Sequence, residues 1–498
     1  MFKRFQASVK QNVTNLVASK WYYWFLALIS FVFVLLFSRS TSPVYAYVGY
    51  DAAIFKQMGM AILKGKTIYL DYFDNKGCLL YFLHALCLWL GGDFVILIFQ
   101  TISLTISLII LDKIISLYKE GASRVYVLLA GLVLLLCFYE GGDLSEEWSL
   151  PFICYPLYRF LKLYKEDKSL NAKDLYFIGL CFGVIAFLRI NNAVPFCGFL
   201  LCLFIGYLWK KQWKSFIINV LAFVGGVLTI AIPCFLYFYL KAGAEGVNWM
   251  VYGTFLSGFD YLGVVLKIHI AVIIFYYLIL VTFIIIHVIS LRGNRLNVPV
   301  IIAYLLFLLT FGTKSSEHYQ MVMLPVYVLC LAGLNIQIKL LKRTLMAVLY
   351  VCVVAFLMRP IGFLLIEATG KDKFGKAYSD FLEKLENIPE TERDSIYNYN
   401  TVMAIGSGLL YSDNRIQSNQ VLFPYLEFWL NDLRENHKPL SETKPLWVMI
   451  SHGIVFPDDM PYLRDNYEER FVFHYDTRYM KDYRSFGVED DIYFFRRK

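Results

Sequence analysis

The chain contains 498 residues with a formal net charge of +8, and 58% of its residues are hydrophobic. A soluble globular chain is about 45–50% apolar, and the long uncharged stretch from His269 to Ile289 is of the kind that crosses a bilayer as a helix. The composition excludes an ordinary soluble protein, the pattern is not the alternating one of an outer-membrane barrel, and basic residues confined to short loops between apolar stretches do not indicate nucleic-acid binding.

The apolar stretches predict an α-helical polytopic membrane protein with about eleven transmembrane helices. A helix that crosses the bilayer needs about 20 mostly apolar residues. The eleven stretches are residues 21–38, 93–117, 124–140, 147–164, 174–189, 193–209, 215–240, 262–290, 298–312, 319–337 and 344–366.

The basic residues predict the orientation, because they precede the first stretch and then fall in alternate loops. They are Lys3, Arg4, Lys10 and Lys20; Lys119 and Arg124; Lys162, Lys165, Lys168 and Lys173; Lys210, Lys211 and Lys214; Arg292 and Arg295; and Lys339, Lys342 and Arg343. Loops rich in lysine and arginine stay in the cytoplasm. We therefore expect a multi-pass protein of the plasma or inner membrane, with a cytoplasmic N-terminus and an extracytoplasmic C-terminus.

The first large loop on the outer side, residues 39–92, is expected to contain two helices. Apolar residues at helical spacing predict an amphipathic helix that starts just after Asp51 and ends at Gly65. A second, apolar helix is expected from about Gly77 to Leu90, and it is too short to span the membrane. Two such helices should lie flat in the outer interface.

Charged side chains, Asp71, Asp74 and Lys76, stand between these two helices. A pocket at the bilayer surface that offers carboxylates and a lysine suits a substrate that is part lipid and part sugar phosphate. Two structural alternatives are open: Asp51 could cap the first helix, and Asp74 could cap the second.

The loop resembles that of the GT-C superfamily of membrane glycosyltransferases, in the branch of protein O-mannosyltransferases, the aminoarabinose transferase of lipid A and bacterial surface-glycan relatives. The resemblance is carried by Asp51, Gly65, Tyr69, Asp71, Asp74, Lys76 and Gly77. Two positions depart from the family pattern: Ala52 stands where some members have glutamate, and Cys78 where proline is usual.

The resemblance implies transfer of a sugar from a polyprenyl-phosphate donor to a cell-surface glycan, lipid or protein. The phosphate leaves as an anion, so the main chemical need is a base for the acceptor hydroxyl. Asp51 is the first candidate for that base, and Glu146 or Glu147 would assist it or bind a divalent metal. Lys76 and Arg189 would stabilise the departing phosphate. No other cofactor is implied.

Further candidates lie in the later outer loops. Glu146 and Glu147 end the segment EGGDLSEE, where Asp143 and Glu146 also have the spacing of a helix capping box. Arg189 stands at the outer end of a predicted span, against the positive-inside trend, and snorkelling is its structural alternative. Asn192 follows and could hydrogen-bond to sugar hydroxyls.

His318 and Tyr319 open another predicted span at the same outer face, which makes them candidate substrate-binding residues. A lone histidine is more often structural than catalytic, and this alternative is open.

Residues 371–498 form a separate polar region after a transmembrane core at 1–370. A helix-like run at 378–385 and strand-like runs at 446–451 and 491–495 predict a small extracytoplasmic α/β domain.

Two functions compete with a glycosyltransferase: a flippase or transporter, and a polymerase, of lipid-linked glycans. The spans contain no evident internal repeat and few charges, which disfavours a transporter. Neither a GxGxxG nor a Walker sequence is present to bind a nucleotide.

Overall fold

The computed structural model describes residues 2–45, 50–71, 74–257, 270–290, 296–311, 316–334, 336–369, 380–381, 383–393, 396–398, 439–451, 459–474 and 491–498. The chain forms two compact units. Unit 1 comprises Met1–Ser38, Leu97–Phe235 and Thr254–Leu364, and unit 2 comprises Arg39–Ile96, Leu236–Gly253 and Leu365–Lys498.

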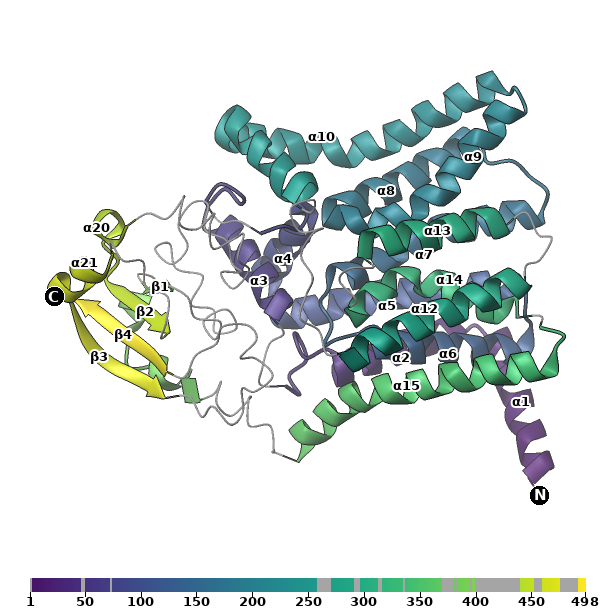
Figure 1. The fold of residues 1–498 in the computed structure, drawn as a ribbon, viewed down its shortest axis with the longest axis horizontal. Coiled ribbons are helices and arrows are strands. Elements are labelled where there is room, and N and C mark those ends of the chain that lie inside the picture. Colours follow the sequence, from purple (N-terminus) through teal and green to yellow (C-terminus); the bar gives the residue numbers. More distant parts are fainter. Residues whose placement is uncertain are drawn as a thin grey trace. The chain divides into compact units, whose positions relative to one another are not determined.

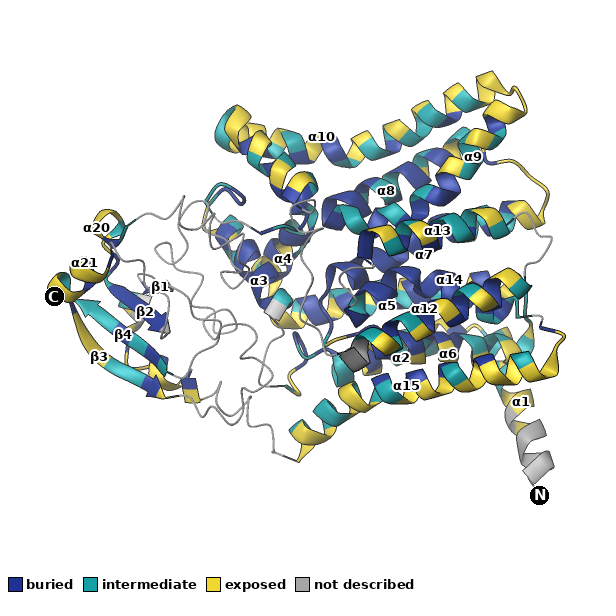
Figure 2. Ribbon diagram, viewed as in Figure 1, coloured by how far each residue is buried: buried dark blue, intermediate teal, exposed yellow. Residues whose placement is uncertain are grey.

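Unit 1 is a helical bundle, in which long apolar helices run side by side (Figure 1). Its helices are α1 (Phe2–Ala18), α2 (Tyr22–Phe37), α5 (Asp93–Ser116), α6 (Gly121–Phe138), α7 (Ser145–Lys165), α8 (Ala172–Ala193), η1 (Val194–Phe196), α9 (Cys197–Trp209), α10 (Trp213–Val251), the π-helix η2 (Tyr252–Leu256), α12 (Ile270–Ser290), α13 (Asn297–Phe311), η3 (Glu317–Met323), α14 (Leu324–Ala332) and α15 (Lys339–Ala368). Of these, α5 and η2 begin in unit 2, and α10 and α15 end in it. Figure 2 shows buried residues concentrated on α7, α8 and α14, whereas α10 and α15 are exposed along much of their length.

Within the described residues, six helices are long and apolar enough to cross a membrane, or up to seven if the bent pair α1 and α2 is one span. Each of the eleven predicted stretches contains a helix, but the count of eleven is not confirmed. The stretch 147–164 carries charged side chains, α13 has only 15 residues, and 319–337 begins as a 3₁₀-helix before the nine-residue α14. The stretches 174–189 and 193–209 form one 38-residue helical segment.

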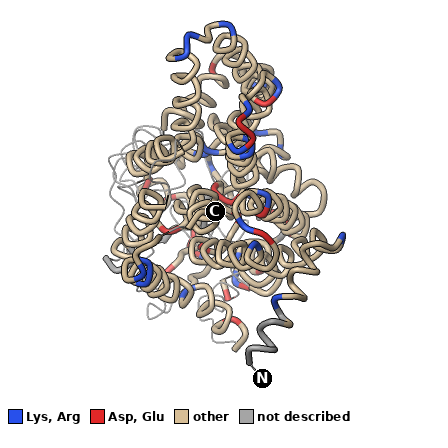
Figure 3. Tube along the Cα trace, turned by 90° about the vertical axis from the view of Figure 1, so that its right-hand side faces the viewer, with Lys and Arg blue, Asp and Glu red and all other residues tan. Residues whose placement is uncertain are grey.

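The basic loops of the described chain lie at one end of the bundle, where α1 meets α2, α5 meets α6, α7 meets α8 and α9 meets α10 (Figure 1). Polar contacts join these loops: Lys165 Nζ donates to the carbonyl of Leu117, and Tyr207 Oη donates to that of Leu170 at 3.2 Å. Figure 3 views this end and shows lysines and arginines along its loops. These loops therefore share one end, as predicted, whereas Arg292 and Arg295 lie outside the described residues.

Unit 2 contains the two short helices of the first large loop, α3 (Tyr50–Leu63) and α4 (Cys78–Leu90), close to their predicted bounds. Gly65 follows α3 with φ +80°, a conformation that favours glycine at a helix end. The two helices pack tightly at Gly59, because a Cβ atom there would lie 2.7 Å from the backbone nitrogen of Ala85.

The C-terminal part of unit 2 contains a four-stranded sheet, which agrees with the predicted α/β region. The strands are β1 (Ile396–Asn398), β2 (Trp447–Ser451), β3 (Tyr467–His474) and β4 (Asp491–Arg497), with α17 (Glu390–Arg393), α20 (Leu440–Thr443) and α21 (Asp459–Asn466) as short helices. The order is β1-β2-β4-β3, with β1 parallel to β2 and the other pairs antiparallel.

Alternate residues of β2 point to two apolar clusters: Trp447 and Met449 pack with Phe381, and Val448 and Ile450 pack in the other. The strands expected at 446–451 and 491–495 are confirmed, whereas β1 and β3 were not predicted. In the helix expected at 378–385, residues 380–381 and 383–385 are helical and the others lie outside the described residues. The boundary at 370 also lies outside them and stays a prediction.

Candidate active site

The predicted site residues fall into two groups, one in each unit. Glu146, Glu147, Arg189, Asn192, His318 and Tyr319 belong to unit 1, on α7, α8 and η3. Asp51, Asp71, Asp74 and Lys76 belong to unit 2, on α3 and the segment between α3 and α4.

Arg189 forms the centre of the unit 1 group. Its backbone is extended (φ −168°, ψ 114°) and interrupts α8, which continues to Ala193 beyond the predicted end of the span. Nη1 lies 2.6 Å from Oε1 of Glu146, and the two side chains are 9% and 1% exposed. The snorkelling alternative is therefore wrong in this fold: the guanidinium turns inward and forms a buried ion pair.

Tyr319 covers the guanidinium of Arg189. The guanidinium carbon lies 5.0 Å from the centre of the Tyr319 ring, and Nη2 donates to the Tyr319 hydroxyl at 3.4 Å. Phe311 lies on the same cation at 6.0 Å. A cation held against aromatic faces and one carboxylate is protected from water, and its charge acts strongly on nearby groups.

Glu147 has a different environment from Glu146. Its carboxylate accepts hydrogen bonds from Gln100 Nε2 at 3.0 Å, from the Tyr139 hydroxyl at 2.8 Å and from the backbone nitrogen of Asp143 at 2.7 Å. These three donors satisfy a buried carboxylate and hold the loop before α7. The geometry indicates a structural role for Glu147.

The capping-box alternative is also wrong, because neither of its two residues caps α7. The residue that precedes α7 is Leu144, with no side-chain cap, and Asp143 instead accepts from Trp148 Nε1 at 2.9 Å. Asp143 and Glu147 fix the loop through these contacts, and the expected capping pair of Asp143 and Glu146 is not formed.

Asn192 is fully buried beside α7. Its Nδ2 donates to Ser149 Oγ at 3.1 Å, while its Oδ1 has no hydrogen-bond partner among the described residues. A buried amide oxygen without a donor favours a water or a ligand hydroxyl at this position.

His318 bonds to Glu140 through Nδ1 and lies in a charged network with Arg359 and Glu317. Arg359 on α15 contacts Glu140 Oε1 at 3.5 Å and also pairs with Glu317. Burial opposes ionisation of Glu140, but the charges of His318 and Arg359 lower its pKa to about 2.

Sequence reasoning did not select Glu317 or Arg359. Arg359 carried a usable signal, because it stands inside the apolar stretch 344–366, where a charge is costly unless it has a partner. Glu317 had no comparable signal in the sequence, because it stands outside the predicted apolar stretches.

In unit 2, Asp51 lies in the first turn of α3 and is partly exposed. The helix begins at Tyr50, so Asp51 is not the residue that precedes it, although a negative charge in the first turn favours the helix dipole. No described residue pairs with its carboxylate.

Lys76 and Asp74 form a buried turn before α4. Lys76 Nζ lies 2.9 Å from Asn75 Oδ1 and 3.9 Å from Asp74 Oδ1, and the Tyr81 hydroxyl donates to Asp74 Oδ2 at 2.7 Å. Asp74 does not cap α4, whose cap is Gly77 with no side-chain bond. Tyr69 closes the same turn, because its hydroxyl donates to the carbonyl of Lys76 at 2.6 Å.

Asp71 stabilises the preceding turn. Its carboxylate accepts from the backbone nitrogen of Thr67 at 2.7 Å. Tyr69, inside this turn, has φ +70°, which is rare for a residue other than glycine. Asp71 thus holds the backbone that presents Tyr69 to Lys76.

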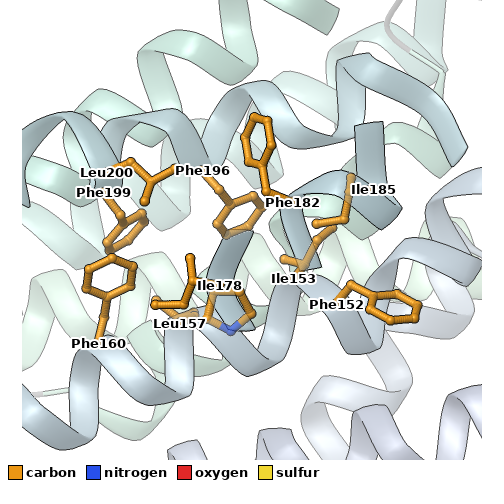
Figure 4. Close-up of a pocket in the computed structure, with 11 residues that line it drawn as sticks. Phe152, Ile153, Leu157, Phe160, Ile178, Phe182, Ile185, Phe196, Phe199 and Leu200 are labelled. Carbon is orange, nitrogen blue, oxygen red and sulfur yellow. The ribbon is translucent and has the colours of Figure 1, made fainter. Parts of the chain in front are cut away.

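A small apolar pocket lies between α7, α8, η1 and α9 (Figure 4). Side chains that line it include Ile153, Leu157, Phe182, Phe196 and Phe199. Such a lining can hold hydrocarbon by dispersion and burial, but it offers nothing to a sugar or a phosphate.

The part of the chain that the structure describes brings no three His, Cys, Asp or Glu residues together as a metal site. No protein-family model matches the sequence, and no curated protein matches it either. The case for a function therefore depends on the residues described above.

Proposed function

We propose that the chain is a membrane glycosyltransferase of the GT-C type, which transfers a sugar from a polyprenyl-phosphate donor to an extracytoplasmic glycan, lipid or protein. The observation that carries the proposal is the first large loop. There, Asp51 opens one short helix, and a buried turn with Asp74 and Lys76 precedes a second helix. Helices of 14 and 13 residues are too short to span and suit the interface where such a donor lies.

Asp51 is the proposed general base. A carboxylate can accept the proton of the acceptor hydroxyl as its oxygen attacks the anomeric carbon, while the bond from that carbon to the phosphate oxygen breaks. The lipid phosphate leaves as an anion and needs no proton. Lys76, in the same unit as Asp51, is the proposed cation that stabilises it.

Glu146 and Glu147 are weaker candidates for the base. Glu146 is engaged by Arg189 at 2.6 Å, and Glu147 accepts three hydrogen bonds within the loop. We assign Glu146 to orienting Arg189 and Glu147 to holding the loop. No step of the mechanism passes through a divalent metal, because the described residues do not fit one.

Substitution of Asp51 tests the proposal. Asn has the size of Asp but cannot take the proton, so Asp51→Asn should fold and bind donor while transfer of labelled sugar from a polyprenyl phosphate falls by about 10²–10⁴-fold. Asp93→Asn is the matched control, since Asp93 is a half-exposed carboxylate of the same unit that pairs with Lys56. Full activity in Asp51→Asn would exclude Asp51 as the base.

The same assay separates the rival functions. A flippase or transporter would move the lipid-linked sugar without breaking its bond to phosphate. A polymerase would consume lipid-diphosphate oligosaccharides and leave the monophosphate donor untouched. Release of polyprenyl phosphate that depends on Asp51 is expected only from the proposed transferase.

A further inference from the structure

The helix α1 differs in direction from the rest of the bundle. Residues Lys10–Ala18 of α1 meet α2 at 107°, which is close to a right angle. If α2 crosses the membrane, a helix perpendicular to it runs along the membrane surface. At the basic end of unit 1, that surface is the level of the lipid headgroups.

The bend between α1 and α2 is fixed by buried polar contacts. Tyr22, the first residue of α2, donates to Asp112 Oδ1 on α5 at 2.9 Å, and Arg124 on α6 pairs with the same carboxylate. Arg124 also lies 5.6 Å from the centre of the Tyr22 ring. These contacts fix the start of α2 next to the bend, and Val13, Leu16 and Val17 of α1 pack against the core of unit 1, so the direction of α1 is a built feature of the fold.

α1 combines an apolar anchor with an exposed cation. Val13, Leu16 and Val17, at helical spacing, pack against the core of unit 1. Lys10, one turn before Val13, is exposed, and so is Lys20, just after the helix. The sequence of α1 contains three basic residues and no acidic residue, so the charge that this helix carries is positive.

Aromatic residues mark the level of the interface at the same end. Trp21 and Trp24, directly after α1, are 62% and 71% exposed. Trp209 and Trp213, which flank the basic loop between α9 and α10 at this end, are 86% and 58% exposed. Tryptophan favours the headgroup level of a bilayer, where lysines beside it meet phosphates.

We infer that α1 and the adjoining Lys20–Trp24 segment form an in-plane surface that binds the headgroups of anionic phospholipids. The exposed Lys10 and Lys20 select anionic over zwitterionic headgroups, and Trp21 and Trp24 fix the segment at the headgroup level. This surface is separate from the proposed transfer of a sugar and needs no substrate.

Spin-labelled lipids test the inference on the full-length protein in phosphatidylcholine vesicles. Electron paramagnetic resonance measures how strongly the protein holds spin-labelled phosphatidylglycerol relative to spin-labelled phosphatidylcholine. We expect the wild type to prefer phosphatidylglycerol, and Lys10→Gln with Lys20→Gln to reduce that preference by about fivefold or more, since each surface lysine contributes substantially. High salt should reduce it too.

The double variant Lys384→Gln with Lys444→Gln removes the same charge from exposed positions of the C-terminal region and should keep the wild-type preference. An equal loss in both double variants would overturn the inference, because net charge alone would then explain the selectivity. An unchanged preference in the α1 variant would also overturn the inference. Both pairs are exposed, so neither change should prevent folding.

Discussion

Arg189 and Glu146 depend on each other, because each is a buried charge whose partner is the other. Removing one member of such a pair costs about 3–5 kcal/mol, since the remaining charge is left without compensation. We predict that Arg189→Met lowers the free energy of unfolding by about this amount, and that adding Glu146→Gln restores most of it. Thermal unfolding of the purified single and double variants measures the loss of stability and its recovery. Equal stability of Arg189→Met and the wild type would contradict the buried pair.

Activity of the same double variant shows whether Arg189 also contacts the donor. A stable double variant that transfers sugar ten- to a thousandfold more slowly, roughly the effect of one lost charge-assisted contact, would support phosphate binding. Activity restored together with stability would restrict Arg189 to a structural role.

Glu140 gives unit 1 a dependence on pH. Its pKa is lowered from the ordinary 4.5 to about 2, so its contribution to stability is complete above pH 4.5 and is lost as the pH falls through 2. We predict that Glu140→Gln is less stable than the wild type at neutral pH and loses less stability on acidification. Unfolding temperatures between pH 7 and about pH 3 measure the difference. Parallel curves for the two proteins would contradict the prediction.

At the residue scale, sequence predicted the types of group better than their partners. The acids of EGGDLSEE and the outer Arg189 were recognisable, because charges beside apolar stretches stand out. The pairing of Glu146 with Arg189 was not recognisable from the sequence, since the two residues are 43 positions apart and meet only after α7 packs on α8. The roles of Glu146 and Glu147 differ through such contacts, although the two residues are neighbours in the chain.

At the scale of elements, α8 and α10 approach closely through glycine. A Cβ atom on Gly226 would lie 2.1 Å from the carbonyl oxygen of Tyr176, whereas one on Gly225 would lie 3.9 Å from the nearest atom, in the Tyr176 ring. We predict that Gly226→Ala forces the helices apart and lowers the unfolding temperature. Gly225→Ala should leave it unchanged or raise it, because alanine favours a helix by about 1 kcal/mol over glycine. Equal effects of the two changes would exclude a close contact at Gly226.

The elements that sequence predicted well have strong local signals. The bounds of α3 and α4 follow from apolar spacing and from flanking glycines. The break of α8 at Arg189 has no such signal, because an extended residue inside an apolar run is selected by tertiary contacts. β3 was missed because three charged residues follow Tyr467 in YEERFVFH and no alternation of apolar and polar residues marks the strand.

For the whole molecule, hydropathy predicted the helical bundle but not its number of spans. Eleven apolar stretches were recognised, whereas six or seven helices of the described chain are long and apolar enough to cross a membrane. The difference arises where helices are short, charged or joined, as at 147–164 and 298–312. Interior helices of a bundle face other helices, so their composition need not match that of a lipid-facing span.

The final prediction concerns the orientation of the whole chain. The loop between α9 and α10, just before Lys214, lies at the basic end of the bundle, and α15 runs from Lys339 near that end to Ala368 at the other (Figure 1). Its 30 residues extend about 45 Å at 1.5 Å per residue, which exceeds the roughly 30 Å hydrocarbon core. Since basic loops stay in the cytoplasm, reporters fused after Lys214 and after Lys498 should report opposite sides, with the C-terminus outside. Reporters on one side would refute this orientation and remove the reason for placing Asp51 at the outer surface.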